Sequence, residues 1–190
     1  MVVAVLAGIV NKSIVSEINA AGGNAIGISG ADARLIEARI ADPELGFVGE
    51  VTKVSPDSII ALLDKGYMPV IAPLGYSQSN GHKWTMLNIN ADTAASEIAC
   101  AVRAKHLIFT SDVPGVLDAS GKVIPRVDRA LAGRLIADGV ASKGMIPKIE
   151  ACLKAAAAGA AAHIIDGRQA KALLDCLDDK PLGTVFKPEK

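Results

Sequence analysis

The segment MLNINADTAASEIACAV, residues 86–102, passes from a polar cluster into an alanine-rich run. Alanine favours helix strongly, so a helix is predicted from just after Asp92 to about Lys105. Asn88, Asn90 and Asp92 occupy alternate positions, so an extended backbone would point their side chains the same way. One such side chain is enough to cap a helix, and an acid suits the positive helix end. Three of them exceed that need, and the surplus indicates a ligand.

Short aliphatic runs alternate with longer helical patterns on both sides of this segment. Strands are predicted at 24–30, 68–76, 106–112, 162–167 and 183–186, and hairpins at 41–56 and at 77–87 with Asn80–Gly81 at the tip. Further helices are predicted up to Gly22–Gly23, at 57–66 with a cap from Asp57 or Ser58, and at 129–139, 147–158 and 168–177. This alternation indicates an α/β fold, a three-layer αβα sandwich whose mainly parallel sheet is covered on both faces.

The composition excludes several classes of protein. Twenty basic residues balance twenty acidic ones, so there is no basic surface for nucleic acid. The apolar run 2–10 is too short to cross a bilayer, and no basic residues precede it as in a secretory signal. Cys100, Cys152 and Cys176 lie far apart, which is typical of buried thiols in a reducing compartment. A cytoplasmic protein without membrane or nucleic-acid partners is predicted.

Known motifs for metals, phosphates and nucleophiles are not found in the sequence. His82, His106 and His163 have no partner at metal-ligand spacing, so no metal site is predicted. No GxxxxGK[ST] loop occurs, and GISGA (27–31) has Ala31 where a nucleophile elbow ends in glycine. Ser29 is therefore interpreted as structural.

Three polar clusters lie where ligands bind in α/β sheets, at the carboxyl ends of strands. Besides 88–92, these are Thr110–Asp118, after a strand, and Ala141–Ala151, where a loop enters a helix. Lys148 falls in the first turn of that helix, where a cation opposes the helix dipole by about 0.3–1 kcal/mol. Either Lys148 points into water, or an anion such as a phosphoryl group binds there. Likewise, 110–118 is either an ordinary turn or part of a site.

Several segments, taken in order, resemble the acetylglutamate kinases of the amino-acid kinase superfamily: VLAGIVNKSIVSEINAAGGNAIGISGAD, GYMPVIAPLG, LNINADTAASEIA, TSDVPGVLD and KGMIPKIEACLKAAAAG. The resemblance runs from residue 1 to the closing LGTVF. It implies phosphorylation of the side-chain carboxylate of N-acetylglutamate, the second step of arginine synthesis. ATP with magnesium would be the co-substrate, and no tightly bound cofactor is implied.

The same resemblance implies roles for individual residues. Asn88 and Asn90 would contact the acylated amino acid, Asp92 would orient catalytic lysines, and Lys148 would stabilise the transferring phosphoryl group. The nucleotide would be held by Asp112, Val113, Pro114, Gly115, Val116 and Leu117, with Ser142 nearby. Residues 1–103 would form the remainder of the acylglutamate-binding lobe, with homo-oligomers through its N-terminal helix. Residues 104–190 would form the nucleotide-binding lobe.

The sequence departs from the family at its front. Family members begin with a strand that carries a catalytic lysine and a Gly-Gly turn, then a second glycine-rich loop and a substrate-binding arginine. This chain opens within the helix that the family uses to pair subunits, and Arg34 and Arg39 follow that helix, so neither is the family's arginine. We therefore expect an N-terminally incomplete fold, negligible kinase activity of the chain alone, and self-association through residues 2–10.

Two alternatives stay open at this point. A related kinase could act on another acylated amino acid, such as an aminoadipate derivative. Alternatively, the chain is a non-catalytic binding or assembly module that retains the interface helix.

Overall fold

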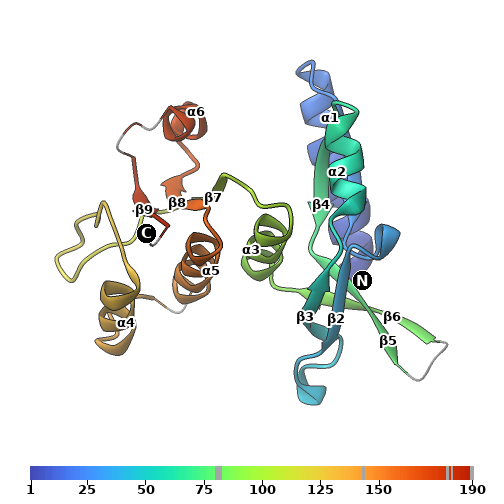
Figure 1. Cartoon of the computed structure of the whole chain (residues 1–190), viewed down its shortest axis with the longest axis horizontal. Coiled ribbons are helices and arrows are strands. Elements are labelled where there is room, and N and C mark those ends of the chain that lie inside the picture. Colours follow the sequence, from blue (N-terminus) through green and yellow to red (C-terminus); the bar gives the residue numbers. More distant parts are fainter. Residues whose placement is uncertain (80–82, 143, 179, 181, 189–190) are drawn as a thin grey trace. The chain divides into compact units, whose positions relative to one another are not determined.

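A computed structural model describes residues 1–79, 83–142, 144–178, 180 and 182–188. The chain forms two compact units, Met1–Val102 and Arg103–Lys190, each with helices and strands (Figure 1). The predicted α/β class is confirmed. Among the described residues, no helix is both long enough and apolar enough to cross a membrane.

The first unit combines a parallel strand pair with a small barrel. Its elements are η1 (Ala4–Val10), α1 (Asn11–Ala20), β1 (Ala25–Ser29), η2 (Asp32–Arg34), β2 (Ile36–Ile40), η3 (Pro43–Leu45), β3 (Val48–Val54), α2 (Asp57–Asp64), β4 (Met68–Ala72), β5 (Leu74–Ser79), β6 (Lys83–Ile89) and α3 (Ala91–Ala101). β1 and β4 pair in parallel, and α1 contacts both of them. The predicted helix 57–66 is found as α2, but it has no side-chain cap, so the predicted cap from Asp57 or Ser58 is wrong.

The barrel corrects the expectation of one mainly parallel sheet. Strands β2, β3, β6 and β5 close on each other in that order, through antiparallel β2–β3 and β5–β6 pairs and parallel β3–β6 and β2–β5 pairs. The predicted single strand 68–76 is divided because Pro73 has no N–H to donate, and β4 ends before it while β5 begins after it. The predicted hairpin 77–87 corresponds to β5 and β6, and its tip at Asn80–Gly81 lies outside the described residues.

The core of this unit lies between the barrel, α2 and α3. Its buried side chains are Leu35, Ile36, Ala38, Ile59, Leu87, Ile89 and Ala94. Because α3 contacts β3 and follows β6 directly, the start of α3 is tied to the barrel wall. This places the NINAD segment, residues 88–92, at the junction of β6 and α3.

The N-terminal helix packs on β1 and β4 through a polar residue. Asn11 is 2% exposed, whereas Val10 and Ile14 are each 43% exposed. The Asn11 side-chain amide donates to the carbonyl oxygens of Ile28 on β1 (3.3 Å) and Val70 on β4 (2.9 Å). Apolar side chains of the N-terminal helix, through which self-association is expected, are therefore turned away from the strands of its own unit.

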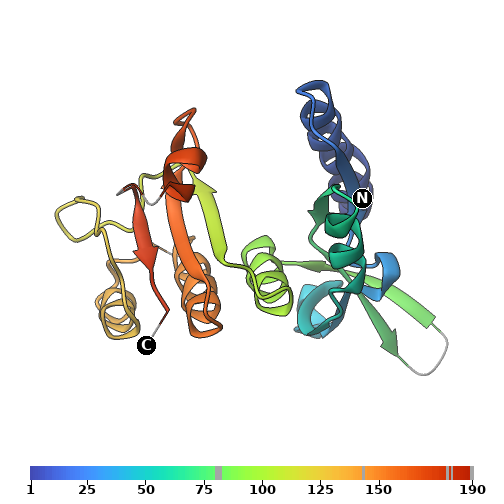
Figure 2. The same ribbon diagram turned by 45° about the horizontal axis from the view of Figure 1, so that its top comes forward.

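The second unit is built on a three-stranded sheet, as Figure 2 shows from a second direction. Its elements are β7 (His106–Ser111), α4 (Arg129–Ala137), α5 (Ile146–Ala157), β8 (Ala161–Asp166), α6 (Ala172–Leu177) and β9 (Thr184–Phe186). β7 and β8 are parallel, β8 and β9 antiparallel. α5 contacts all three strands, and α6 contacts β8. Every element predicted here is found, although α6 begins four residues later than the predicted helix 168–177.

Candidate functional site

The three polar residues of the NINAD segment, Asn88, Asn90 and Asp92, have different surroundings. β6 ends at Ile89, so the alternation of an extended strand does not reach Asp92. Asn90 is the N-cap of α3: its Oδ1 accepts from the backbone N–H of Thr93 at 3.0 Å. Asp92 lies in the first turn of α3. Capping thus accounts for Asn90, and an acid near the positive helix end is favourable at Asp92.

Asn88 is the residue of this cluster that faces a cavity. A cavity of about 310 Å³ in the first unit is lined by Met1, Val2, Val3, Leu45, Phe47, Val48, Leu74, Met86 and Asn88. The backbone N–H of Asn88 donates to the carbonyl oxygen of Phe47, but its side-chain amide makes no hydrogen bond within the described part of the chain. An amide offers both donors and an acceptor. In this apolar surrounding, Asn88 is suited to bind an amide or carboxyl group of a small ligand.

The predicted nucleotide residues converge on a cavity in the second unit. The segment 112–117 follows β7, and Val113, Gly115, Val116 and Leu117 line a cavity of about 110 Å³. Its other walls are Val140, Ala141, Ser142 and Met145. The structure therefore brings Ser142 together with four of the six loop residues, while Asp112 and Pro114 are not among the lining residues. Ligand pockets commonly measure about 300–1,000 Å³, so this cavity has room for one ring or one small group rather than a whole nucleotide.

Lys148 follows the lining residue Met145 by three positions, about one helical turn. It is the third residue of α5, half-buried, and follows Pro147. The start of α5 has no side-chain cap and no acidic residue in its first turn. Backbone N–H groups at such a helix start attract anions, and a lysine in the same turn adds positive charge.

An ion pair at the carboxyl edge of β7 and β8 was missed in the sequence. Ser111 and Asp166 are the last paired residues of the two strands, and the N–H of Gly167 donates to the carbonyl oxygen of Ser111 at 2.9 Å. Asp166 is 8% exposed and accepts from Arg168 through Nε (2.8 Å) and a terminal guanidinium nitrogen (2.9 Å). These hydrogen bonds lower the pKa of Asp166 to about 2. The only sequence signal was Asp-Gly-Arg directly after a predicted strand.

This ion pair predicts a specific pH dependence of stability. An unfolded aspartate has a pKa of about 3.9, so the lower folded pKa stabilises the protein above that pH. The contribution should be lost as the pH falls from about 4 towards about 2. Unfolding curves of the parent chain and of Asp166→Asn, measured through this range, should therefore converge on acidification. A difference between the two proteins that does not shrink below pH 4 would contradict the assignment.

Within the residues that the structure describes, no three His, Cys, Asp or Glu side chains group to hold a metal. His82 lies outside those residues. His106 and His163 lie on neighbouring strands with their ring centroids 6.0 Å apart, and the cysteines form no disulfide.

The sequence also matches a known family. A family model described as "Amino acid kinase family" matches residues 1–166. The chain belongs to the amino acid kinase family. Its predicted resemblance to the acetylglutamate kinases is confirmed by curated relatives. The acetylglutamate kinase of Gloeobacter violaceus is 46% identical over 96% of this chain. That of Dehalococcoides mccartyi is 43% identical over 97% of it. The chain spans 62% and 69% of the length of these two relatives.

Solved structures share the fold of this chain. The smu.665 protein of Streptococcus mutans superimposes with a TM-score of 0.83 at 30% identity, over 98% of this chain and 70% of that protein. A carbamate kinase of Giardia gives a TM-score of 0.70 at 17% identity, over 98% of this chain and 70% of the other. The second likeness shows the shared fold alone.

Proposed function

We propose that this amino acid kinase chain serves the ATP-dependent phosphorylation of the side-chain carboxylate of N-acetylglutamate, a step of arginine biosynthesis. The observation that carries the proposal is the match to acetylglutamate kinases along 96% of the chain or more. The convergence of four loop residues (Val113, Gly115, Val116 and Leu117) and Ser142 on one cavity supports it from the structure. Five of the seven residues predicted to hold the nucleotide therefore line the same cavity.

The second unit would hold the nucleotide. In this proposal Asp112, Val113, Pro114, Gly115, Val116, Leu117 and Ser142 surround it, with magnesium accompanying ATP. Lys148 would bind the terminal phosphate together with the N–H groups of α5, because positive charge aimed at the transferring phosphoryl group is the main catalytic requirement. The absence of an acid from the first turn of α5 is consistent with an anion site at that helix start.

The first unit would hold the acylated amino acid. Asn88 is the strongest candidate, because its amide faces an apolar cavity and makes no hydrogen bond within the described residues. Asn90 is proposed as a second contact. Its Oδ1 already accepts from both the backbone N–H and the hydroxyl of Thr93, so its amide N–H groups are what it offers a ligand. Asp92 would orient the catalytic lysines.

Calorimetry tests the proposal directly. Magnesium-ATP or ADP should bind weakly but measurably to the 190-residue chain in the absence of any acylated amino acid. N-acetylglutamate should bind in a second titration, and Asn88→Leu should abolish that binding while nucleotide binding persists. Tighter binding of an N-acylated aminoadipate would favour the alternative kinase. A folded chain that binds neither nucleotide nor acylated amino acid would refute the kinase assignment and favour an assembly module.

Homo-oligomers through the N-terminal helix are part of this proposal. Val5, Ile9, Val10 and Ile14 are 38%, 65%, 43% and 43% exposed, and an exposed apolar face of this kind is typical of an interaction site. A cytoplasmic location stays a prediction from the sequence.

A further inference from the structure

A buried threonine lies beneath the predicted nucleotide loop. Thr184, the first residue of β9, is 0% exposed. Its hydroxyl accepts from the backbone N–H of Val116 at 2.8 Å and donates to the carbonyl oxygen of Ile124 at 2.7 Å. A hydroxyl has one hydrogen to donate, so both of these contacts define its orientation.

The two residues held by Thr184 belong to opposite arms of the same loop. The N–H of Ile124 donates to the carbonyl oxygen of Val116 at 2.8 Å, and Leu117 forms a β-bridge with Val123. The chain therefore leaves the cavity at 116–117, turns, and returns beside itself. The Thr184 hydroxyl joins both arms at the neck of this turn.

The surrounding backbone leaves little freedom at this neck. A Cβ on Gly115 would lie 2.7 Å from Thr184 Oγ1, and a Cβ on Gly183 would lie 2.1 Å from the carbonyl oxygen of Ile164. The N–H of Val185 donates to the carbonyl oxygen of Pro125 at 3.0 Å, and that of Val127 donates to the carbonyl oxygen of Val185 at 3.1 Å. β9 thus holds the returning arm by its backbone and by the Thr184 hydroxyl, and the same hydroxyl holds the outgoing arm.

We propose that Thr184 is a positioning residue for the nucleotide: by holding Val116 it keeps the loop wall of the cavity (Val113, Gly115, Val116 and Leu117) in the shape that binds ADP and ATP. This inference rests on the proposed nucleotide site in the second unit. Thr184 is not among the residues that line this cavity, and its effect passes through Val116. If the hydroxyl is removed, one N–H and one C=O remain buried without that partner, and the loop must rearrange to reach water.

The test is a graded series at position 184. Thr184→Ser keeps a hydroxyl, Thr184→Cys offers only a weak thiol donor, and Thr184→Val has a similar shape without either. ADP affinity, measured by calorimetry, should fall about threefold or less for Ser and about tenfold or more for Val, with Cys between them. Exchange of the Val116 amide hydrogen should accelerate in the same order. If Val does not fold, the comparison of Ser with Cys carries the test.

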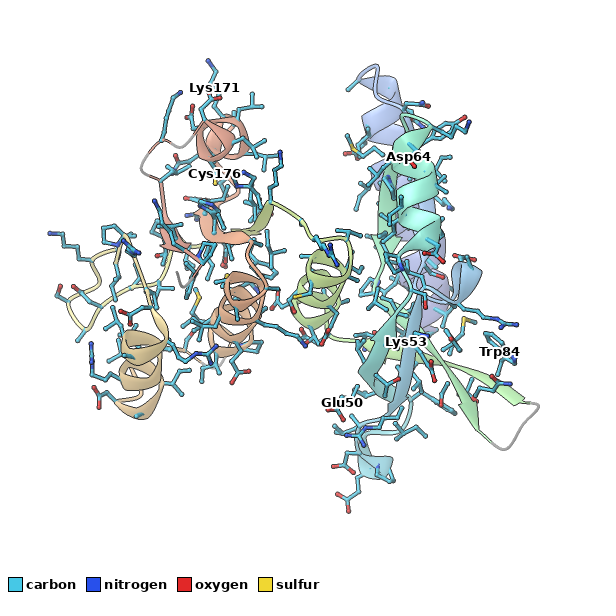
Figure 3. The ribbon with its side chains drawn as sticks, in the orientation of Figure 1. Glu50, Lys53, Asp64, Trp84, Lys171 and Cys176 are labelled. Atoms are coloured by element: carbon cyan, nitrogen blue, oxygen red, sulfur yellow. The ribbon has the colours of Figure 1, made fainter. Side chains whose placement is uncertain are left out.

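Cys176→Ala is the matched control. Cys176 is 1% exposed and packs from α6 against Ile165, away from the loop (Figure 3). This variant should lose thermal stability and keep its ADP affinity. Equal ADP affinity across the series at position 184, or an equal loss in Cys176→Ala, would overturn the positioning role while the nucleotide site stands. A folded parent chain that binds no ADP would instead refute the proposed function, and this inference with it.

Discussion

Replacing Lys148 by alanine should weaken the binding of magnesium-ATP by about tenfold to a hundredfold, which corresponds to the loss of a hydrogen bond to a charged group. ADP binding should fall by about threefold or less, because the lysine is assigned to the terminal phosphate that ADP lacks. Lys148 lies in the first turn of α5, whose start carries neither an acid nor a side-chain cap. In the proposed site, the substitution therefore removes positive charge from the helix start at which the anion would bind. Calorimetric titration of the two nucleotides measures the difference.

Two other variants separate this effect from a general loss of charge. Lys154→Ala removes a lysine from the last turn of the same helix and should leave both nucleotide affinities unchanged. Asp92→Asn should also change binding little, because its proposed role is to orient lysines during transfer. Equal losses of ATP and ADP affinity in Lys148→Ala would exclude the terminal-phosphate assignment, and an ATP loss in Lys154→Ala would show that the effect is not local.

Most of the second unit could be predicted from the sequence because its signals are local. The apolar runs 106–111 and 161–166 lie in parallel strands, and alanine-rich 146–157 forms a helix. Of the residues 112–117 and Ser142 that were predicted to hold one ligand, Val113, Gly115, Val116, Leu117 and Ser142 line one cavity, and their role in binding stays a prediction. Thr184 could not be identified, because its two hydrogen bonds join residues that are 68 and 60 positions away.

The barrel of the first unit was harder to predict for a physical reason. In β2, the charged residues Glu37 and Arg39 alternate with Ile36, Ala38 and Ile40. This alternation marks a strand with one face exposed, and a search for continuous apolar runs passes over it. Closure of the barrel depends on a single Glu37–Tyr76 pairing between β2 and β5, which no local pattern predicts.

The polar start of α3 shows the same limit at a site. Three alternating polar residues indicated one shared ligand face, but the backbone changes from strand to helix between Ile89 and Ala91. Asn90 satisfies a backbone N–H, while Asn88 faces the cavity. The sequence alone predicted that this cluster holds more polar side chains than one helix cap needs. Identifying Asn90 as the residue that caps α3 required the backbone conformation.

Gly27→Ala is expected to destabilise the first unit strongly, costing about 3 kcal/mol or more. A Cβ at this position would lie 1.9 Å from Asn11 Oδ1, and Asn11 cannot withdraw because its amide is held by the carbonyl oxygens of Ile28 and Val70. The new methyl group must therefore break those hydrogen bonds or push α1 away from β1 and β4. Urea unfolding of the variant should show the loss as a lower midpoint.

A double-mutant cycle decides whether this clash is the cause. Asn11→Ala should cost about 1–3 kcal/mol by itself, because it removes the donor to two strand carbonyls. In that background Gly27→Ala should cost less than about 1 kcal/mol, or even stabilise, because the obstructing oxygen is gone and alanine restricts the unfolded chain. The other close atom, Lys12 Nζ at 2.7 Å, ends a flexible, exposed side chain that can move away. Gly8→Ala, which meets no atom within 4 Å, is the control and should not destabilise. If the costs of Gly27→Ala and Asn11→Ala simply add, Gly27 is required by the strand itself and not by the amide that joins α1 to it.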